Sequence, residues 1–329
     1  MLSLELFLPC PLPIDGDDHR ALETLPGLRR ILSRARPKRF EQIGVDILLF
    51  EAFAVERQRD WPVAAFTWLA DGGETDTRFR LRADPVHLRA ERDIVMLVDA
   101  SHLELSVEVA ATLVASLNAH FEQDGLHFSA PAPSRWYVSL PAPPDIATSP
   151  LSSAAGRNID ALLPRGGDAL TWHRWFNEIQ MLFHSHPVNA DREAAGHPAI
   201  NSVWFWGGGT LPSSVSSGFA GAWGEDPLLH GLGQAAKLAW APAPPDAEGW
   251  LSQASEGRHV MVLDAPRAVS VEAVHHLERA WFAPLLRAVK ERRLSTLVLL
   301  ARTGEDSLRY ELTGSDLWKF WRRAPALTR

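Results

Sequence analysis

Short apolar runs recur along the chain, separated by segments rich in turn-forming and polar residues. Runs of four to eight apolar residues are typical of strands, and continuous ones indicate strands that are covered on both faces. We predict strands over residues 2–8, 46–50, 62–68, 79–83, 94–98, 136–140, 202–206, 259–263 and 296–300.

Other segments carry apolar residues at the i, i+3, i+4, i+7 spacing of an amphipathic helix. Thr24 and Ser106 are suitable N-caps for the first two helices, and Pro284 is expected to kink or divide the longest one. We predict helices over residues 26–35, 107–121, 172–183, 231–238 and 271–290, and a closing amphipathic segment that starts at 317–321.

Strands that alternate with helices predict an α/β fold with a mainly parallel sheet covered by helices on both faces. In such sheets ligands bind at the carboxyl ends of the strands. That rule directs attention to the loops after Val98, Trp206, Leu263 and Leu300. Residues 141–170 are rich in Pro, Ala, Ser and Gly, which predicts a flexible linker or lid. It would join an N-terminal part of the core, residues 1–140, to a C-terminal part, residues 171–329.

Composition narrows the class of protein. The net charge is −7, with 40 Asp and Glu against 33 Lys and Arg. Nucleic-acid binders usually carry a basic excess, so a nucleic-acid partner is not expected. No apolar run approaches the roughly 20 residues of a membrane-spanning helix, so no membrane partner is expected. The single cysteine, Cys10, rules out an internal disulfide and a Cys-based zinc cluster. We therefore expect a cytoplasmic protein.

Three segments together carry a family resemblance. They are Arg-Ala-Asp-Pro-Val-His-Leu from residue 82, His-Ser-His-Pro-Val-Asn from residue 184, and Ile-Asn-Ser-Val-Trp-Phe-Trp-Gly-Gly-Gly from residue 200. In order and spacing the chain resembles archaeal-type cofactor-independent phosphoglycerate mutases of the alkaline-phosphatase superfamily, over about residues 60–300. It resembles still more closely the bacterial regulatory proteins of RpfE type.

The resemblance implies an alkaline-phosphatase-like core with an inserted or lid-like portion. In the active enzymes a Ser or Thr nucleophile takes the phosphoryl group between two divalent metals, which Asp and His residues hold. Here three loops depart from that pattern, so we expect neither a metal nor another cofactor. In their place the chain has Pro9-Cys10-Pro11, Asp264-Ala265-Pro266-Arg267-Ala268 and Ala301-Arg302-Thr303-Gly304.

We expect the ligand-binding residues to lie in and near the resembling segments. An arginine can grip a carboxylate or phosphate with two hydrogen bonds, and a glycine turn after a strand can offer N–H groups to an anion. The candidates are Arg82, Asp84, His87, Arg135, His186, Asn189, Arg192, Gly207, Gly208 and Gly209. The alternatives are a turn cap at Asp84, surface ion pairs at Arg135 and Arg192, helix-end hydrogen bonding at His186, and a tight turn with positive φ at the glycines.

The expected function is a non-catalytic, mutase-like regulatory protein that binds a small phosphorylated or carboxylate ligand. One alternative is an active phosphoglycerate mutase or a metal-dependent phosphohydrolase. Its replacement ligands would be Asp15, Asp17, Asp264, His259 or the His184 and His186 pair. A second alternative is a protein-interaction module anchored by exposed tryptophans, which cluster at 172–175, 204–206 and 318–321. No catalytic residue is assigned.

Overall fold

The computed structural model describes residues 1–11, 23–40, 44–92, 94–263, 271–303, 306–319 and 321. The chain divides into two compact units. Unit 1 contains Met1–Val55 and Ser214–Arg329, and unit 2 contains Glu56–Ser213. These boundaries differ from the predicted divisions at residues 140 and 170. The first strand of unit 1 pairs with a strand more than 250 residues later, and local sequence patterns carry no signal of so distant a pairing.

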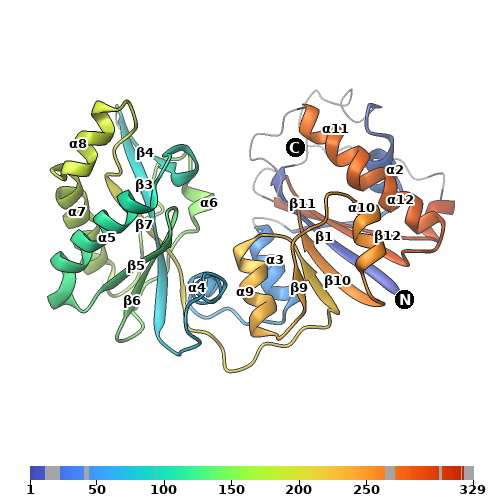
Figure 1. The fold of residues 1–329 in the computed structure, drawn as a ribbon, viewed down its shortest axis with the longest axis horizontal. Coiled ribbons are helices and arrows are strands. Elements are labelled where there is room, and N and C mark those ends of the chain that lie inside the picture. The colour runs from blue at the N-terminus through green and yellow to red at the C-terminus, as the bar shows by residue number, and fades with distance from the viewer. Residues whose placement is uncertain are drawn as a thin grey trace. The chain divides into compact units, whose positions relative to one another are not determined.

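Unit 1 contains a seven-stranded sheet in the order β2-β12-β11-β1-β10-β8-β9 (Figure 1). All neighbours from β11 to β9 are parallel, and β12 and β2 add an antiparallel edge. The mainly parallel sheet is therefore confirmed for this unit. The strands are β1 (Leu2–Pro11), β2 (Arg36–Phe40), β8 (Gly221–Trp223), β9 (Trp240–Ala241), β10 (Gly257–Val262), β11 (Thr296–Thr303) and β12 (Asp306–Thr313).

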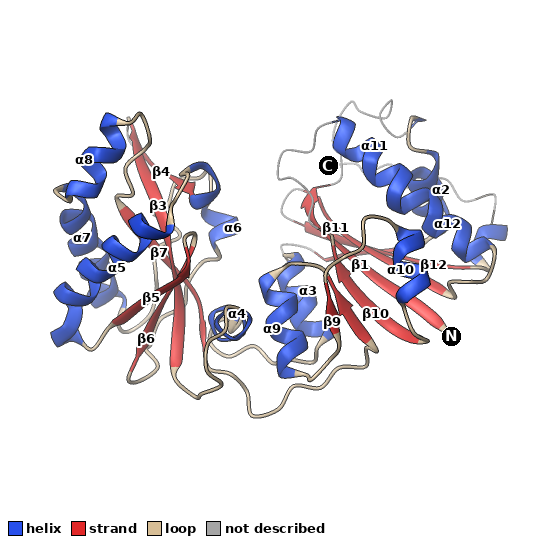
Figure 2. Ribbon diagram, viewed as in Figure 1, coloured by secondary structure: helices blue, strands red, loops and turns tan. Residues whose placement is uncertain are grey.

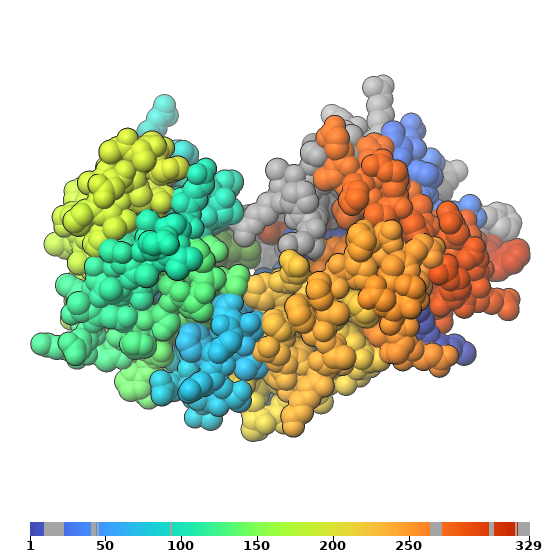
Figure 3. All heavy atoms as spheres, viewed as in Figure 1, coloured from blue at the N-terminus to red at the C-terminus, as the bar shows by residue number. Residues whose placement is uncertain are grey.

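Helices cover both faces of this sheet, as predicted (Figure 2). Leu4, Leu6 and Leu8 of β1 share a core with residues of α2 and α12, while α3 and α9 contact the sheet on its other side. In Figure 3 residues of α10, α11 and α12, in orange, lie on the surface of unit 1. The helices are α2 (Pro26–Arg34), α3 (Val45–Ala52), α9 (Pro227–Ala235), α10 (Ala247–Gln253), α11 (Val271–Leu277) and α12 (Ala283–Lys290).

The predicted helix over 271–290 is divided by a π-helical segment, Glu278–Phe282, just before Pro284. The buried Glu278 carboxylate accepts hydrogen bonds from the backbone N–H groups of Gly27 (2.6 Å) and Leu28 (3.0 Å) at the start of α2. The N-cap residue of α2 is Leu25, which makes no side-chain cap. The predicted cap at Thr24 is therefore wrong, because a distant carboxylate satisfies these donors.

Unit 2 contains a five-stranded antiparallel sheet in which the long strand β3 pairs with β4, β6 and β7. The core on one face is filled by α5 and α7, and α4 contacts β3 and β7. The strands are β3 (Phe79–Glu91), β4 (Ile94–Asp99), β5 (His127–Ala132), β6 (Arg135–Leu140) and β7 (Ser202–Gly209). The helices are α4 (Val63–Ala70), α5 (Val107–Phe121), α6 (Leu151–Ala154), α7 (Ala169–His184) and α8 (Pro187–Ala194).

Two predicted strands are helices. The apolar runs at 46–50 and 62–68 form α3 and α4, because a short run that is apolar throughout fits a buried helix as well as a buried strand. The strand expected to end before Pro85 instead continues through it to Glu91. In the described part of the closing segment the structure has the 3-10 turn Asp316–Trp318. The remaining predicted strands and helices are present, with boundaries shifted by a few residues.

Residues 141–170 belong to unit 2 rather than joining two halves of the chain. Ile146, Ala154 and Ile159 are buried in it. The backbone of Leu97 in β4 donates to Arg157 (3.4 Å) and accepts from Gly156 (2.8 Å), so this segment covers one edge of the sheet. Within the described ranges, no helix has the length and apolar character needed to cross a membrane.

Candidate functional site

The alternation of β3 separates its polar from its apolar side chains. Successive residues of a strand point to opposite faces. Leu81 and Ala83 join the core formed with α5 and α7, so Arg80, Arg82 and Asp84 lie on the other face of the strand. We name this group the Arg82 cluster, and it comprises Asp71, Arg80, Arg82, Asp84, Arg135, Tyr137 and Trp206.

Arg82 is buried between two aromatic rings. It lies opposite Tyr137 of β6 and Trp206 of β7, and its guanidinium is 5.4 and 5.3 Å from their ring centroids. Its Nε and Nη2 donate to Asp84 Oδ1 at 3.1 and 2.6 Å. The other carboxylate oxygen, Asp84 Oδ2, accepts from Trp206 Nε1 at 2.8 Å. This buried ion pair is thus satisfied within the protein.

Asp84 is fully buried. Burial raises its pKa above the ordinary aspartate value, because desolvation penalises the charged form more than the Arg82 charge and the Trp206 hydrogen bond favour it. Asp84 lies within β3, so the alternative of a turn cap before Pro85 is wrong.

Arg135 and Tyr137 of β6 converge on Asp71, which follows the last residue of α4. Arg135 Nη2 is 2.5 Å from Asp71 Oδ1 and its Nε is 3.0 Å from Oδ2. The Tyr137 hydroxyl donates to Asp71 Oδ2 at 2.6 Å. The hydrogen bond to Asp71 raises the pKa of Arg135, and burial raises that of Tyr137. In this structure Arg135 therefore grips a carboxylate of the protein itself.

The three glycines of β7 lie where neighbouring atoms approach closely. Gly207 has φ +65°, and a Cβ there would be 2.9 Å from Val63 Cβ at the start of α4. A Cβ on Gly208 would be 2.9 Å from the Phe79 ring, and one on Gly209 would be 2.5 Å from Pro62. The alternative with positive φ is confirmed for Gly207, whose N–H donates to Thr148 Oγ1 (3.2 Å). Close packing therefore accounts for the presence of glycine at all three positions.

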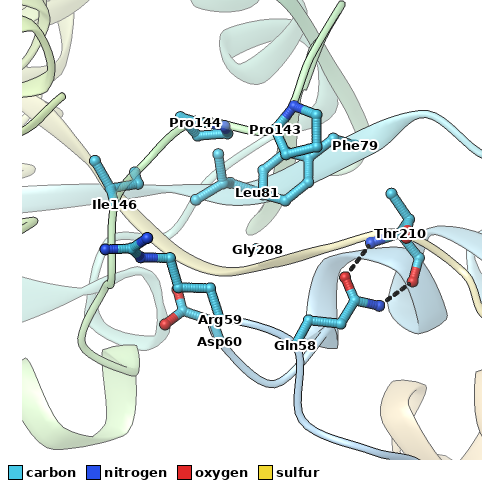
Figure 4. A pocket seen from close by; sticks show the side chains of 10 residues that line it. All are labelled: Gln58, Arg59, Asp60, Phe79, Leu81, Pro143, Pro144, Ile146, Gly208 and Thr210. Carbon is cyan, nitrogen blue, oxygen red and sulfur yellow. Dashed lines mark hydrogen bonds between the residues drawn. The ribbon is translucent and has the colours of Figure 1, made fainter. Parts of the chain in front are cut away.

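A hollow of about 170 Å³ lies beside Gly208 (Figure 4). On one side Gln58 exchanges two hydrogen bonds with the backbone of Thr210, at 2.7 and 3.0 Å. The nearby Asp60 carboxylate accepts from the N–H and the hydroxyl of Thr148. Burial raises the pKa of Asp60 in spite of these hydrogen bonds. The lining residues are Gln58, Arg59, Asp60, Phe79, Leu81, Pro143, Pro144, Ile146, Gly208 and Thr210.

Four other candidates bond to loop backbone or cap a helix. Arg192 donates to the carbonyls of Pro198, Glu104 and Leu103, and Asn189 exchanges hydrogen bonds with Ile200. His186 caps α8, its Nδ1 accepting from the N–H of Val188 at 3.2 Å. His87 Nδ1 is 2.8 Å from the carbonyl of Ala199. Helix-end bonding at His186 is confirmed, and the proposed ion pair at Arg192 is replaced by bonds to carbonyls. A ligand-binding role for these four residues stays a prediction.

In unit 1 the parallel pairing brings the ends of three strands to one edge of the sheet. Phe7 of β1 is in register with Val262 of β10 and Leu300 of β11. Near these ends, Leu8 of β1, Leu263 directly after β10 and Ala301 of β11 are all buried, and Arg302 follows in β11. This is the edge where the resemblance implies metal ligands.

The ligands weighed as replacements do not gather in the described part of the chain. No group of three or more His, Cys, Asp or Glu side chains there is arranged to hold a metal ion. His259 lies within β10, where Trp223 Nε1 donates to its Nδ1 (3.1 Å) and its Nε2 is 2.8 Å from the Ser255 carbonyl. The pair His184 and His186 lies in unit 2, where His184 is exposed at the end of α7 and His186 caps α8. The other candidates, Asp15, Asp17 and Asp264, lie outside the described residues. So do the side chain of Cys10 and most of the predicted metal loops, namely Gly16, 265–268 and Gly304.

The tryptophan clusters differ in exposure. Trp172 and Trp204 are buried in the unit 2 cores. Trp318 and Trp321 of unit 1 are 80% and 68% exposed. These two are the strongest remaining candidates for an interaction anchor.

Sequence reasoning missed Asp60, Asp71, Tyr137 and Thr148. Tyr137 had a usable signal, because it lies in the predicted strand 136–140, two residues after Arg135, and a strand that begins one residue earlier places both on one face. Asp71 stands in an Asp-Gly-Gly turn, and its link to β6 spans 64 residues. Such long-range pairings carry no local signal.

Comparisons with known proteins add a family likeness. A 2,3-bisphosphoglycerate-independent phosphoglycerate mutase from Methanothrix thermoacetophila is 31% identical over 137 residues. The chain is similar to cofactor-independent phosphoglycerate mutases. The match covers 40% of this chain and 34% of the relative, so it spans about a third of that protein. No family model matches the chain.

Two solved structures are similar to the chain as a whole. The PH0037 protein from Pyrococcus horikoshii gives a TM-score of 0.52 at 13% identity, over 95% of this chain and 87% of that one. The cofactor-independent phosphoglycerate mutase from Thermoplasma acidophilum gives 0.46 at 16% identity, over 94% and 90%. The likeness to PH0037 shows a shared α/β fold.

Proposed function

We propose that this protein is a mutase-like regulatory protein, similar in role to the RpfE-type family. It binds a small phosphorylated or carboxylate ligand and does not carry out two-metal phosphoryl transfer. The observation that supports the proposal is the carboxyl edge of the unit 1 sheet, where β1, β10 and β11 end side by side.

The described residues at this edge include no carboxylate or imidazole that could hold a two-metal centre. Such a centre needs several carboxylates and imidazoles to hold both ions. Among the described residues near these ends, Leu8, Leu263 and Ala301 are not metal ligands, and the positive charge of Arg302 opposes a divalent cation. The same charge favours an anion, and for this reason the proposed ligand is a phosphorylated or carboxylate acid.

The test combines metal analysis, an activity assay and ligand-dependent melting of the full chain. We expect no stoichiometric Mn, Zn or Co and no interconversion of phosphoglycerates with added metal. We also expect 3-phosphoglycerate to raise the melting temperature, with the shift lost in Arg302→Ala and largely kept in Arg302→Lys. Arg258→Ala, which removes an exposed arginine from β10, is the matched control.

An active mutase is the second candidate, favoured by the 31% identity to an enzyme of that name. Two metal ions per chain, together with turnover that is lost in Asp264→Ala, would establish this activity and overturn the proposal. Absence of both metal and any melting shift with 3-phosphoglycerate would also reject it.

A further inference from the structure

Strand β2 is an exposed, strongly basic edge strand. It lies at one edge of the unit 1 sheet and pairs with β12. Its residues Arg36, Pro37, Lys38 and Arg39 are exposed. An edge strand presents unpaired backbone N–H and C=O groups along its outer side. No described strand pairs with the outer side of β2, so among the described residues this edge combines unpaired main-chain groups with three cationic side chains.

The 3-10 turn after β12 holds an exposed tryptophan near the start of this strand. The buried Asp316 carboxylate accepts from Lys319 Nζ at 2.5 Å and lies 3.5 Å from Arg36 Nε. The Arg34 guanidinium, just before β2, donates to the Lys319 carbonyl. Trp318, which lies between Asp316 and Lys319 in the sequence, is 80% exposed. We name Arg36, Lys38, Arg39, Trp318 and Lys319 the β2 surface.

The charge of the β2 surface contrasts with that of the chain. Residues 25–40 contain six Lys and Arg and no Asp or Glu, whereas the whole chain carries −7. Asp306 and Glu311 of the adjacent β12 are each engaged by an arginine, Arg39 and Arg309 respectively. Lys38 lies over the Phe40 ring at 4.6 Å and makes no ion pair among the described residues. Counted over the residues that the structure describes, the surface keeps an excess of positive charge.

These features indicate which kind of partner can bind to the β2 surface. A second copy would bring the same cations edge to edge, and that repulsion disfavours self-pairing. A nucleic acid or an anionic membrane could neutralise the cations, but neither has backbone groups that pair in register with a strand. An extended polypeptide has them. Arg and Trp are also the side chains that most often dominate protein interfaces.

We propose that the β2 surface is a docking site for an extended acidic segment of a partner protein. The segment pairs with the outer edge of β2, sets its carboxylates against Lys38 and its neighbouring cations, and packs an apolar side chain on Trp318. Pro37 removes one donor from the strand. The inference is independent of the proposed small ligand, which concerns the carboxyl edge of the same sheet.

The test is selection of random twelve-residue peptides on the immobilised full chain. We expect enriched peptides to be acidic, with apolar residues at alternate positions. Binding of a selected peptide should weaken at least tenfold in Lys38→Glu and in Trp318→Ala, and should fall with added salt. Replacing alternate peptide residues by proline should abolish binding, because proline cannot donate to a strand.

Arg89→Glu is the matched control, since it makes the same charge change at an exposed position of unit 2, and it should leave binding unchanged. Circular dichroism checks that each variant is folded. The proposal is overturned if no peptide is enriched, if the enriched peptides lack acidic residues, or if Lys38→Glu binds them normally. It is overturned equally if oligo-dT or phosphatidylserine vesicles bind in a Lys38-dependent manner while the peptides do not.

Discussion

The two units bury charge in different ways. Unit 2 buries arginines, and Arg80, Arg82 and Arg192 are each less than 9% exposed. In the described part of unit 1 the buried charged groups are Glu278 and Asp316. The difference follows from strand direction. A parallel sheet between helices is apolar on both faces, whereas an antiparallel sheet alternates and can keep one polar face.

In unit 2 helix α4 packs against the polar face of the sheet. The charged side chains of that face must therefore be paired inside the protein. The Arg82 cluster meets this requirement with ion pairs and aromatic rings. Buried arginines are therefore weak indicators of an external anion, and their partners must be located before a ligand is assigned. In unit 1, Lys38 at the sheet edge is exposed and makes no ion pair among the described residues.

The largest expected effect comes from breaking the buried pair of unit 2. Asp84→Ala leaves Arg82 buried without its carboxylate, and removing one partner of such a pair typically costs about 3–5 kcal/mol. We expect faster amide hydrogen exchange in β3, β6 and β7 and unchanged exchange in β1 and β10. Asp306→Ala, which removes a partly exposed ion pair from unit 1, is the control. Equal protection of β3 in both variants would contradict the account.

A smaller effect is expected at the start of α2 in unit 1, where the Glu278 carboxylate accepts hydrogen bonds from the backbone. Glu278→Ala leaves the N–H groups of Gly27 and Leu28 buried without their acceptor, a loss of about 3 kcal/mol at most. Exchange should accelerate in α2 and not in unit 2. Glu278→Gln keeps one good acceptor, so its exchange rate in α2 should lie between those of the wild type and Glu278→Ala. If α2 exchanges as slowly in Glu278→Ala as in the wild type, the Glu278 hydrogen bonds do not stabilise this helix.

Gly207 allows the packing effect to be separated from backbone strain. Gly207 and Gly196 both have positive φ, but a Cβ at Gly196 meets nothing within 4 Å. Gly196→Ala should cost about 1 kcal/mol for the left-handed backbone. Gly207→Ala should cost about 2–3 kcal/mol, because the contact with Val63 adds to that strain. Urea unfolding monitored in unit 2 measures both, and equal losses would show that packing contributes nothing.

The smallest effect concerns pH, and its sign differs between the units. Burial raises the pKa of Asp60, so unit 2 should lose stability as the pH rises through that value. At Asp316 burial is outweighed by hydrogen bonds from Lys319 and Thr313, which lower its pKa to about 2. Unit 1 should therefore lose stability, by about 2 kcal/mol at most, as the pH falls from 4 to 2. In pH-dependent hydrogen exchange, Asp316→Asn should remove the slope of unit 1, and Asp60→Asn should reduce that of unit 2, where Asp84 also has a raised pKa. Slopes of the same sign would contradict these assignments.

Sequence patterns predicted the elements that are long or strongly periodic. Helix α7 and strand β11 show this, because each has one clear apolar pattern. The patterns failed for α3 and α4, whose apolar runs are short. They also failed for the division into units, which depends on β1 pairing with β10. At the candidate site, Arg82 and Asp84 could be selected by the family resemblance. Their burial and pairing depend on β6 and β7, which lie about 50 and 120 residues further along the chain.

The insertion of unit 2 between the two parts of unit 1 has a consequence during translation. Leu2 pairs with Gly257, so β1 leaves the ribosome 255 residues before its partner in β10 is made. At about 5–20 residues per second, the wait is on the order of ten to fifty seconds. All of unit 2 emerges in that interval and can fold first. The nascent β1, with Leu4, Leu6 and Leu8 uncovered, is then the segment that most needs protection by a chaperone.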